Sequence, residues 1–393
     1  MSDARQAAVR IIGRVMRSGA YSNVVLPHET ADLDKRDRRH AQYLAYGVLR
    51  HLDRLDRIID GYSQRPAIEP EVRDVLRLGA FELLESRTPS HAAIDSAVGT
   101  VRSLGYHRAT GFVNAILRSI DRHGDPDPGV ASALPGWLTD SLVKAWGPEE
   151  AAEFTAASMT DAPLTVRARP GAAAEGLEPV SSIPGAYQAE TVGPGLMVQD
   201  GASIAVGLAA AIQPGEVVYD MAAAPGGKAL HAYDALAGTG LLVLGDRHPR
   251  RMVSARRRLA KAGADVPWVL ADARRTPFAD DTFEVVLLDA PCSGLGTLRR
   301  RPEIKHRSKP EDITRMAGFQ TLMLDEAVRI TKSGGRVVYS VCTVTPSETI
   351  DVVAAHEAPP PAGLPGRTWG KGLLLGPHLT GTDGMFISIV SVT

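Results

Sequence analysis

The sequence has little of several features that mark whole classes of protein. Only two of its 393 residues are cysteine, and aromatic residues make up 5%. This excludes a disulfide-rich secreted scaffold, which carries several bridges in a short chain. The N-terminus also lacks the continuous apolar run of a signal peptide. We therefore expect both thiols to be free and the protein to be cytoplasmic.

An excess of charge of one sign and a long hydrophobic run are also missing. Lysine and arginine total 44 against 45 aspartate and glutamate, so a nucleic-acid partner must be argued from local basic patches. The longest apolar stretch, near 204–212, falls well short of the ~20 residues that a membrane helix needs. We expect a globular chain that does not bind a membrane.

Motifs for phosphate and metal binding are absent as well. There is no G-x-G-x-x-G and no G-x-x-x-x-G-K-[ST] sequence, which disfavours dinucleotides and nucleoside triphosphates as ligands. Two cysteines without a C-x-x-C spacing or a nearby histidine pair offer too few ligands for zinc. We predict no metal site.

What is present is a chain long enough for two or three domains. Apolar residues recur at helical spacing over 44–55 and 112–120, and a Pro/Gly-rich linker follows at 123–129. These patterns predict an all-helical domain over 1–128. Residues 129–199 contain a helix over 137–158 and then interrupted pieces, which predict a small α+β connector.

From residue 200 short apolar runs alternate with loops and helical stretches. Strand–helix alternation of this kind predicts a parallel, doubly wound α/β sheet over 200–393. The expected strands are Val217–Met221, Leu241–Gly245, Pro267–Ala271, Val285–Asp289 and Arg336–Val341. The last apolar run, 385–392, follows a Gly/Pro-rich stretch rather than a helix and is interpreted as an antiparallel edge strand.

A glycine-rich turn follows the first of these strands, in VVYDMAAAPGGKALHAYDAL (217–236). Such a turn lies at the carboxyl end of its strand, where ligands bind, and Gly226 and Gly227 let the backbone approach a ligand closely. Asp246 ends the next strand, as expected for a carboxylate that binds ribose hydroxyls. An ordinary tight turn explains the pattern equally well. If a ligand binds, an adenosine-bearing cofactor without a pyrophosphate fits best.

The segment VVLLDAPCSGLGTLRRRPEIKHRSK (285–309) places a cysteine and a basic run side by side. A buried strand leads to Asp289 and then to Cys292, which lies in a site loop rather than mid-strand among aliphatic residues. A charge run is ordinarily a solvated face, but its place beside a thiol favours contact with a phosphate backbone. The candidate RNA-binding residues are Arg299, Arg300, Arg301, Lys305 and Arg307.

The second cysteine follows the strand in GGRVVYSVCTVTPSE (334–348). Parallel strands align their carboxyl ends, so Cys342 and Cys292 can meet despite their separation in sequence. Packing is the ordinary role of one cysteine at a strand end. Because both cysteines of the chain lie at strand ends where ligands bind, packing alone is a much weaker explanation for them.

The motifs APGGK, DAPCSG, RPEIK and YSVCT, in this order, resemble those of the RNA 5-methylcytosine methyltransferases of the RsmB (Fmu/Sun) type. The stretches AQYLAYGVLR, RDVLRLGAFELLESRTPSHAAIDSAVG and GFVNAILRSI look like the NusB-like domain of that family, and PLTVRARP and GTDGMF match as well. The resemblance implies a class I Rossmann-like methyltransferase sheet, mostly parallel with an antiparallel last strand. A NusB-like RNA-binding domain and the connector would precede it.

The resemblance also implies roles for residues at matching positions. Cys342 would be the nucleophile that adds to C6 of cytosine, and Cys292 would support the elimination at C5 that releases the product. Asp289 would sit near the base and Lys228 close to the reacting groups. S-adenosylmethionine would be held by Ala222, Ala223, Ala224, Pro225, Gly226, Gly227, Lys228, Asp246, Asp272 and Asp289.

Such a pair of thiols suits the chemistry of cytosine. C5 is a poor nucleophile until a thiolate adds at C6, and the covalent step divides one hard reaction into two easier ones. The resemblance implies an enzyme that methylates small-subunit (16S) rRNA as a monomer without an obligate protein partner. The chain departs from the family pattern at Ala222, Ala229, Val341, His248, His306 and Arg169.

Two other functions fit parts of the sequence. A DNA cytosine-5 methyltransferase would use the cysteine after proline, Cys292, as its nucleophile, but it does not need Cys342. A non-catalytic RNA-binding or antitermination protein would use the NusB-like part alone. The intact thiols and Asp289 argue against that reading.

Overall fold

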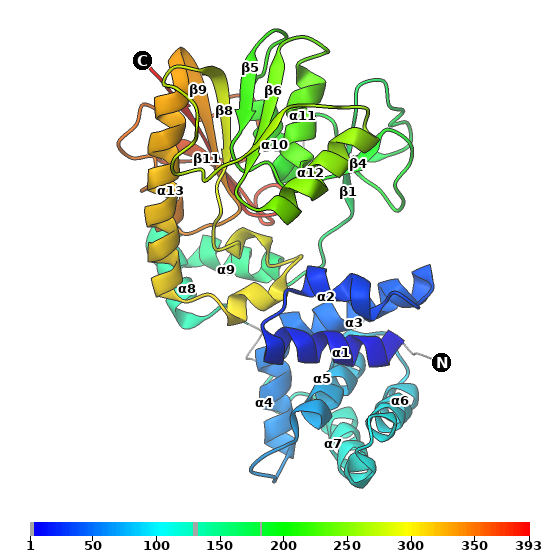
Figure 1. The fold of residues 1–393 in the computed structure, drawn as a ribbon. Coiled ribbons are helices and arrows are strands. Elements are labelled where there is room, and N and C mark those ends of the chain that lie inside the picture. The colour runs from blue at the N-terminus through cyan, green and yellow to red at the C-terminus, as the bar shows by residue number, and fades with distance from the viewer. Residues whose placement is uncertain (1–3, 129–132, 181–182) are drawn as a thin grey trace. The chain divides into compact units, whose positions relative to one another are not determined.

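The computed structural model describes residues 4–128, 133–180 and 183–393, which form two compact units (Figure 1). The first unit comprises Met1–Pro135 together with Leu298–Arg307, and the second comprises Gly136–Thr297 together with Ser308–Thr393. The first division lies close to the predicted boundary at 128. From Gly136 onward the predicted connector falls in the second unit, and its separation from 200–393 as a domain of its own stays a prediction.

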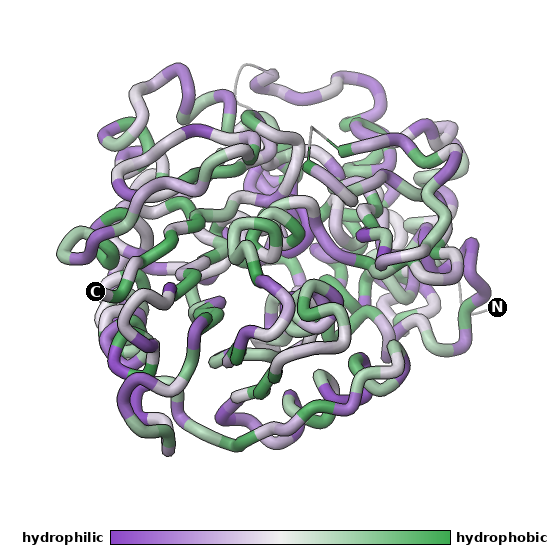
Figure 2. Tube along the Cα trace, turned by 90° about the horizontal axis from the view of Figure 1, so that it is seen from above, coloured by the Kyte–Doolittle hydropathy of each residue, from purple (hydrophilic) through white to green (hydrophobic). Residues whose placement is uncertain are grey.

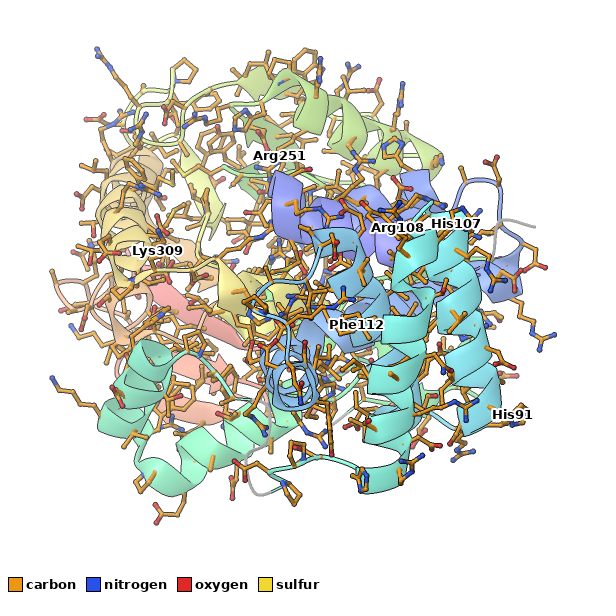
Figure 3. All side chains as sticks on the ribbon, turned by 90° about the horizontal axis from the view of Figure 1, so that it is seen from below. His91, His107, Arg108, Phe112, Arg251 and Lys309 are labelled. Atoms are coloured by element: carbon orange, nitrogen blue, oxygen red, sulfur yellow. The ribbon has the colours of Figure 1, made fainter. Side chains whose placement is uncertain are left out.

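The first unit is helical, as the apolar periodicity predicts. Its helices are α1 (Ala4–Ser18), α2 (Ser22–Glu29), α3 (Lys35–Arg50), α4 (Leu52–Tyr62), α5 (Pro70–Glu85), α6 (Ser90–Ser103) and α7 (Thr110–His123). Leu44, Val48 and Leu55, which recur at helical spacing, are fully buried in one shared core. Polar side chains take the outer faces; His91, at the start of α6, projects away from the helices in Figure 3.

The segment Leu298–Arg307, which contains the basic run, packs within this helical unit. Glu303 is fully buried and accepts hydrogen bonds from the Ser22 backbone N–H at 3.0 Å and its hydroxyl at 2.9 Å. Lys305 is also buried and pairs with Asp53 at 3.1 Å. Buried charges need such partners, so these contacts anchor the segment to the helices.

The second unit begins with a helical pair and a small sheet. The single helix expected over 137–158 is divided into α8 (Gly136–Trp146) and α9 (Pro148–Ser158), because Gly147 adopts φ 90° and Pro148 starts a new helix. Four antiparallel strands then pair in the order β2-β3-β1-β4. They are β1 (Thr165–Ala168), β2 (Glu178–Pro179), β3 (Ala186–Gln188) and β4 (Leu196–Val198).

The main sheet has eight strands in the order β10-β11-β12-β9-β8-β5-β6-β7. Five strands are parallel, as predicted: β5 (Val217–Asp220), β6 (Leu241–Asp246), β7 (Trp268–Leu270), β8 (Phe283–Asp289) and β9 (Thr331–Val341). The strand β12 (Met385–Ser391) is antiparallel, also as predicted. It is not an edge strand, because β11 (Gly372–Leu375) and β10 (Arg367–Trp369) extend the sheet beyond it.

Helices cover both faces of this sheet. One core joins Val218 and Leu244 to the helices α10 (Gly201–Ala209), α11 (Gly227–Ala235) and α12 (Pro249–Lys261). Successive strand residues point to opposite faces, so Tyr219 lies on the other side, which α13 (Pro310–Ile330) covers through β8 and β9. Figure 2 shows hydrophobic and hydrophilic stretches alternating along the trace, as expected for elements that bury one face. Within the described ranges, none of the helices combines the length and the apolar character needed to span a membrane.

Candidate active site

The carboxyl ends of the central strands meet at one edge of the main sheet. Asp220 ends β5, Asp289 ends β8, and Asp289 is paired in register with Ser340 of β9. A pocket of about 250 Å³ opens at this edge. Its walls are Val198, Gln199, Asp200, Ser203, Asp220, Ala222, Ala223, Ala224, Pro225, Gly227, Lys228, Arg258 and Asp289.

The glycine-rich turn forms one wall of this pocket, as the sequence predicts. Ala222 to Pro225, Gly227 and Lys228 all line it. Gly226 does not line it but faces α12, where an added Cβ would lie 3.1 Å from Leu259 and 3.2 Å from the backbone of Ala255. Its φ of 96° is also one that glycine adopts readily. The turn therefore needs glycine at 226 both for its shape and for its contact with α12.

Asp220, at the end of β5, lines the pocket but is not among the site residues that the sequence predicts. Its side chain is 1% exposed, and within the described ranges neither carboxylate oxygen has a hydrogen-bond partner. Burial, helped by the nearby charge of Asp289, raises the pKa of Asp220 to about 7, against the opposing effect of Lys228. A buried carboxylate of this kind, at the edge of a pocket, is a candidate for binding a cationic or hydrogen-bonding ligand group.

The acids Asp246 and Asp272 do not line the pocket. Asp246 is buried and accepts a hydrogen bond from the His248 backbone N–H at 2.8 Å, so the departure at 248 leaves a usable donor. Arg251 of α12 lies 3.7 Å from Asp246 and donates to the Ala224 carbonyl at 2.9 Å, which ties α12 to the turn. Asp272 pairs with Arg274, whose guanidinium lowers the pKa of Asp272 to about 2.

Arg251 and Arg258 are further residues that the sequence did not single out, because the basic pattern of α12 reads as a solvated outer helix. Most of that helix is exposed, but Arg258 reaches the pocket. Arg169, a departure from the family pattern, forms a two-pronged ion pair with Asp234 of α11 and donates to the Ala262 carbonyl. That contact fixes the small sheet beside α11 and α12.

The two cysteines meet, as the alignment of strand ends predicts. The sulfur atoms of Cys292 and Cys342 lie 3.3 Å apart, and both thiols are free. The hydrogen bond with Cys342 and burial raise the pKa of Cys292 well above its ordinary value. Two thiols this close do not both ionise readily, and the positive charge of Lys228 interacts with Cys342, which makes Cys342 the candidate thiolate.

A lysine–aspartate pair stands beside the thiols. Lys228 Nζ lies 2.7 Å from Asp289 Oδ2, and the Ser340 hydroxyl donates to Asp289 Oδ1 at 2.9 Å. Burial acts to lower the pKa of Lys228, but Asp289 and then Cys342 raise it above the ordinary lysine value. Lys228 is thus held as a cation beside Asp289, where its charge would favour a thiolate at Cys342.

The structure divides the five candidate RNA-binding residues into two groups. Lys305 donates to Asp53 and to the Ala133 carbonyl, and Arg307 donates to the carbonyls of Val15, Gly19 and Ala20. These two side chains therefore hold the segment to the helical unit. The remaining three, Arg299, Arg300 and Arg301, are partly exposed.

The strand order, the turn and the pocket together define a Rossmann-like methyltransferase fold. Solved structures agree: the protein PH0851 superposes with a TM-score of 0.81 over 100% of this chain and 99% of its own, at 20% identity. NSun6 from Pyrococcus horikoshii does so with 0.57 over 66% of this chain and 99% of its own, at 19% identity. At such identities the likeness concerns the fold alone.

Sequence comparison specifies the family. Residues 208–390 match the model of the 16S rRNA methyltransferase RsmB/F, and residues 2–122 match the NusB family. Ribosomal RNA small subunit methyltransferase B of Pseudomonas putida is 33% identical, and the match covers 91% of this chain and 89% of that protein. The protein of the same name from Thermus thermophilus is 36% identical, and the match covers 84% of this chain and 81% of that protein. A putative methyltransferase of Mycobacterium tuberculosis is 32% identical over 98% and 96%. The chain belongs to the RsmB/F methyltransferase family.

Proposed function

We propose that this protein transfers a methyl group from S-adenosylmethionine to C5 of a cytosine in small-subunit rRNA, through a covalent bond between Cys342 and C6. The observation that carries the proposal is the pair of sulfur atoms 3.3 Å apart, next to the Lys228–Asp289 ion pair. A single attacking thiol does not require a second one at that distance. In a reaction with separate attack and release steps, a second thiol at that distance can assist the release.

The pocket suits S-adenosylmethionine as the cofactor. Asp220 offers a buried carboxylate without donors, which can accept hydrogen bonds from an amino-acid ammonium group. The turn Ala222–Gly227 carries no side chain larger than proline, so its backbone can approach the cofactor. Asp246 and Asp272 do not line this pocket. For both we retain the predicted role in binding S-adenosylmethionine, with Asp246 at the ribose hydroxyls.

The residues of the site can then act in order on the target base. The cofactor supplies an electrophilic methyl group. Cys342 as thiolate adds to C6, which makes C5 nucleophilic enough to accept that methyl. The C5 proton then leaves to a base, and the sulfur of Cys342 leaves C6 as thiolate. A Cys292 thiol that donates to this sulfur stabilises it as it departs and so supports the elimination.

RNA is the proposed substrate because the relatives carry names of small-subunit rRNA methyltransferases. With a net charge of −1, the chain has no general attraction for a polyanion, so local contacts must provide it. We propose the helical unit and Arg299, Arg300 and Arg301 for that role. The enzyme would act in the cytoplasm as a monomer.

Two alanine variants test this mechanism on small-subunit rRNA from a strain that lacks the protein. Cys342→Ala should transfer no methyl and form no covalent complex, because nothing attacks C6. Cys292→Ala should accumulate a protein–RNA adduct visible on a denaturing gel, because release is slowed. Binding of labelled S-adenosylmethionine, unchanged in both, serves as the control for folding. Adduct formation by Cys342→Ala would reverse the assignment, and turnover by both variants would exclude the thiol mechanism.

A further inference from the structure

Behind the two cysteine loops lies a buried carboxylate that the mechanism above does not use. Glu348 is fully buried, on the short 3-10 helix Pro346–Glu348 that follows β9. It accepts hydrogen bonds from the backbone N–H of Ser293 at 2.8 Å and from its hydroxyl at 2.6 Å. It also accepts from the hydroxyls of Thr343 at 3.1 Å and Thr345 at 2.9 Å.

The donors come from both cysteine loops. Ser293 directly follows Cys292 in sequence, and Thr343 directly follows Cys342. Their two hydroxyl oxygens also lie 2.7 Å apart, so one hydroxyl can donate to the other in place of Glu348. One carboxylate therefore joins the loop after β8 to the loop after β9, immediately behind the sulfur atoms.

A third element completes the arrangement. Gln320 of α13 donates to Glu348 at 3.2 Å and to the carbonyl of Pro291, the residue before Cys292, at 2.9 Å. The Tyr339 hydroxyl donates to the backbone carbonyl of Glu348 at 2.7 Å. Since the cluster fixes residues on both sides of Cys292, the loop has little freedom to move independently of Cys342.

We propose that Glu348 is a positioning residue, which sets the distance and orientation of the two thiols by binding both of their loops at once. Glu348 acts on the thiols through Ser293 and Thr343, the residues that follow the two cysteines and donate to its carboxylate. This role rests on the proposed function, in which two thiols act in succession on one base. A misplacement of about 1 Å at such a site can lower a rate by about 100-fold.

The charge of Glu348 has a second effect on the pair. After Cys342 and burial, the negative charge of Glu348 is a further cause that raises the pKa of Cys292. The phenol of Tyr339 is also close enough that a charge on Cys292 raises its pKa, after the larger effect of burial. The positive charge of Lys228, by contrast, interacts electrostatically with Cys342. Glu348 therefore favours a thiol at 292 and Lys228 a thiolate at 342.

The test uses Glu348→Gln, which keeps the shape of the side chain and removes its charge. The rate constant of methyl transfer, kcat, should fall about 100-fold, while the KM for S-adenosylmethionine changes less than about 3-fold, because the cofactor pocket does not include Glu348. The matched control is Glu326→Gln. Glu326 is another buried carboxylate of the second unit, bonded to Thr276 and Arg329 away from the thiols, and its variant should keep kcat.

A second readout is independent of methyl transfer. In a Cys342→Ala background Cys292 is the single thiol, and the pH dependence of its alkylation by iodoacetamide reports its pKa. Adding Glu348→Gln should shift that profile to lower pH, and adding Glu326→Gln should leave it in place. A merely structural role for Glu348 would not produce this shift.

The outcomes separate the two proposals. If wild-type protein transfers no methyl to RNA but the alkylation profile shifts, the proposed function fails and the coupling of Glu348 to Cys292 stands. A Glu348→Gln variant with unchanged kcat and an unchanged profile overturns the inference. If that variant does not fold, Thr343→Val, which removes one donor with little change of shape, should lower kcat by about 10-fold, and an unchanged kcat there also overturns it.

Discussion

Asp220 shows how one residue of the pocket couples ligand binding to stability. Its pKa in the fold, about 7, lies above the ordinary value of 3.8. The folded protein therefore binds this proton more tightly than the unfolded chain does, so the contribution of Asp220 to stability is present at low pH and is lost as pH rises toward 7. A cationic ligand group beside Asp220 would remove this penalty at neutral pH.

We predict that Asp220→Asn removes part of the pH dependence of the unfolding free energy of the protein without ligand. Between pH 5 and pH 8 the wild type should lose up to about 3 kcal/mol of unfolding free energy more than the variant does. Urea unfolding at the two pH values measures the difference. Asp272→Asn is the control, because a pKa of about 2 keeps Asp272 ionised over this range. Equal slopes for wild type and Asp220→Asn would contradict the prediction.

At the scale of elements, the contact between the turn and α12 shapes the cofactor pocket. Gly226 meets Leu259 and the backbone of Ala255, and Arg251 of the same helix binds the Ala224 carbonyl. Backbone atoms cannot move aside as a flexible side chain can. A methyl group at 226 must therefore displace either the turn or the helix.

We predict that Gly226→Ala destabilises the second unit by about 2–4 kcal/mol and weakens S-adenosylmethionine binding at least 10-fold. Part of the cost comes from the positive φ alone. Gly263→Ala isolates that part, since Gly263 has φ 79° and open space around its Cα. It should cost about 1–2 kcal/mol and leave cofactor affinity unchanged. Unfolding and calorimetric titration measure both quantities, and equal effects of the two variants would refute the packing argument.

At the scale of the whole molecule, the two units are joined by more than the linker after the helical domain. Leu298–Arg307 interrupts the second unit in sequence but packs within the first. Arg50 donates to the Arg299 carbonyl at 3.0 Å, and His306 contacts the Leu49 carbonyl at 3.0 Å. Together with the contacts of Lys305 and Arg307, these bonds make the segment a second attachment between the units.

We predict that cutting the linker does not separate the protein into two pieces. With a protease site inserted between Asp127 and Pro128, which are exposed, the cleaved fragments should elute together on size exclusion. The double variant Lys305→Ala/Arg307→Ala should weaken their association at least about 10-fold. The control Lys309→Ala/Arg315→Ala changes two cations just beyond the segment; Lys309 is labelled in Figure 3. Fragments that separate without any substitution would show that the segment is not an attachment.

The sequence by itself determined the class of each part and much of the site. Helical periodicity predicted the first unit, and strand–helix alternation predicted the parallel sheet, because both patterns depend on neighbours in sequence. It also predicted that Cys292 and Cys342 meet, since parallel strands share one edge. The interruption of a helix at Gly147–Pro148 and the inner place of β12 were missed, the latter because an edge is defined by strands elsewhere in the chain.

Only the tertiary structure decided which polar residues have partners. Lys305 and Arg307 belong to a basic run in sequence, yet the fold places them against the helical unit. Asp220 and Glu348 look like ordinary acids in the sequence. The fold buries both and leaves the first without a donor while it surrounds the second with donors from three elements. Burial and pairing depend on residues distant in the chain, so no local pattern can specify them.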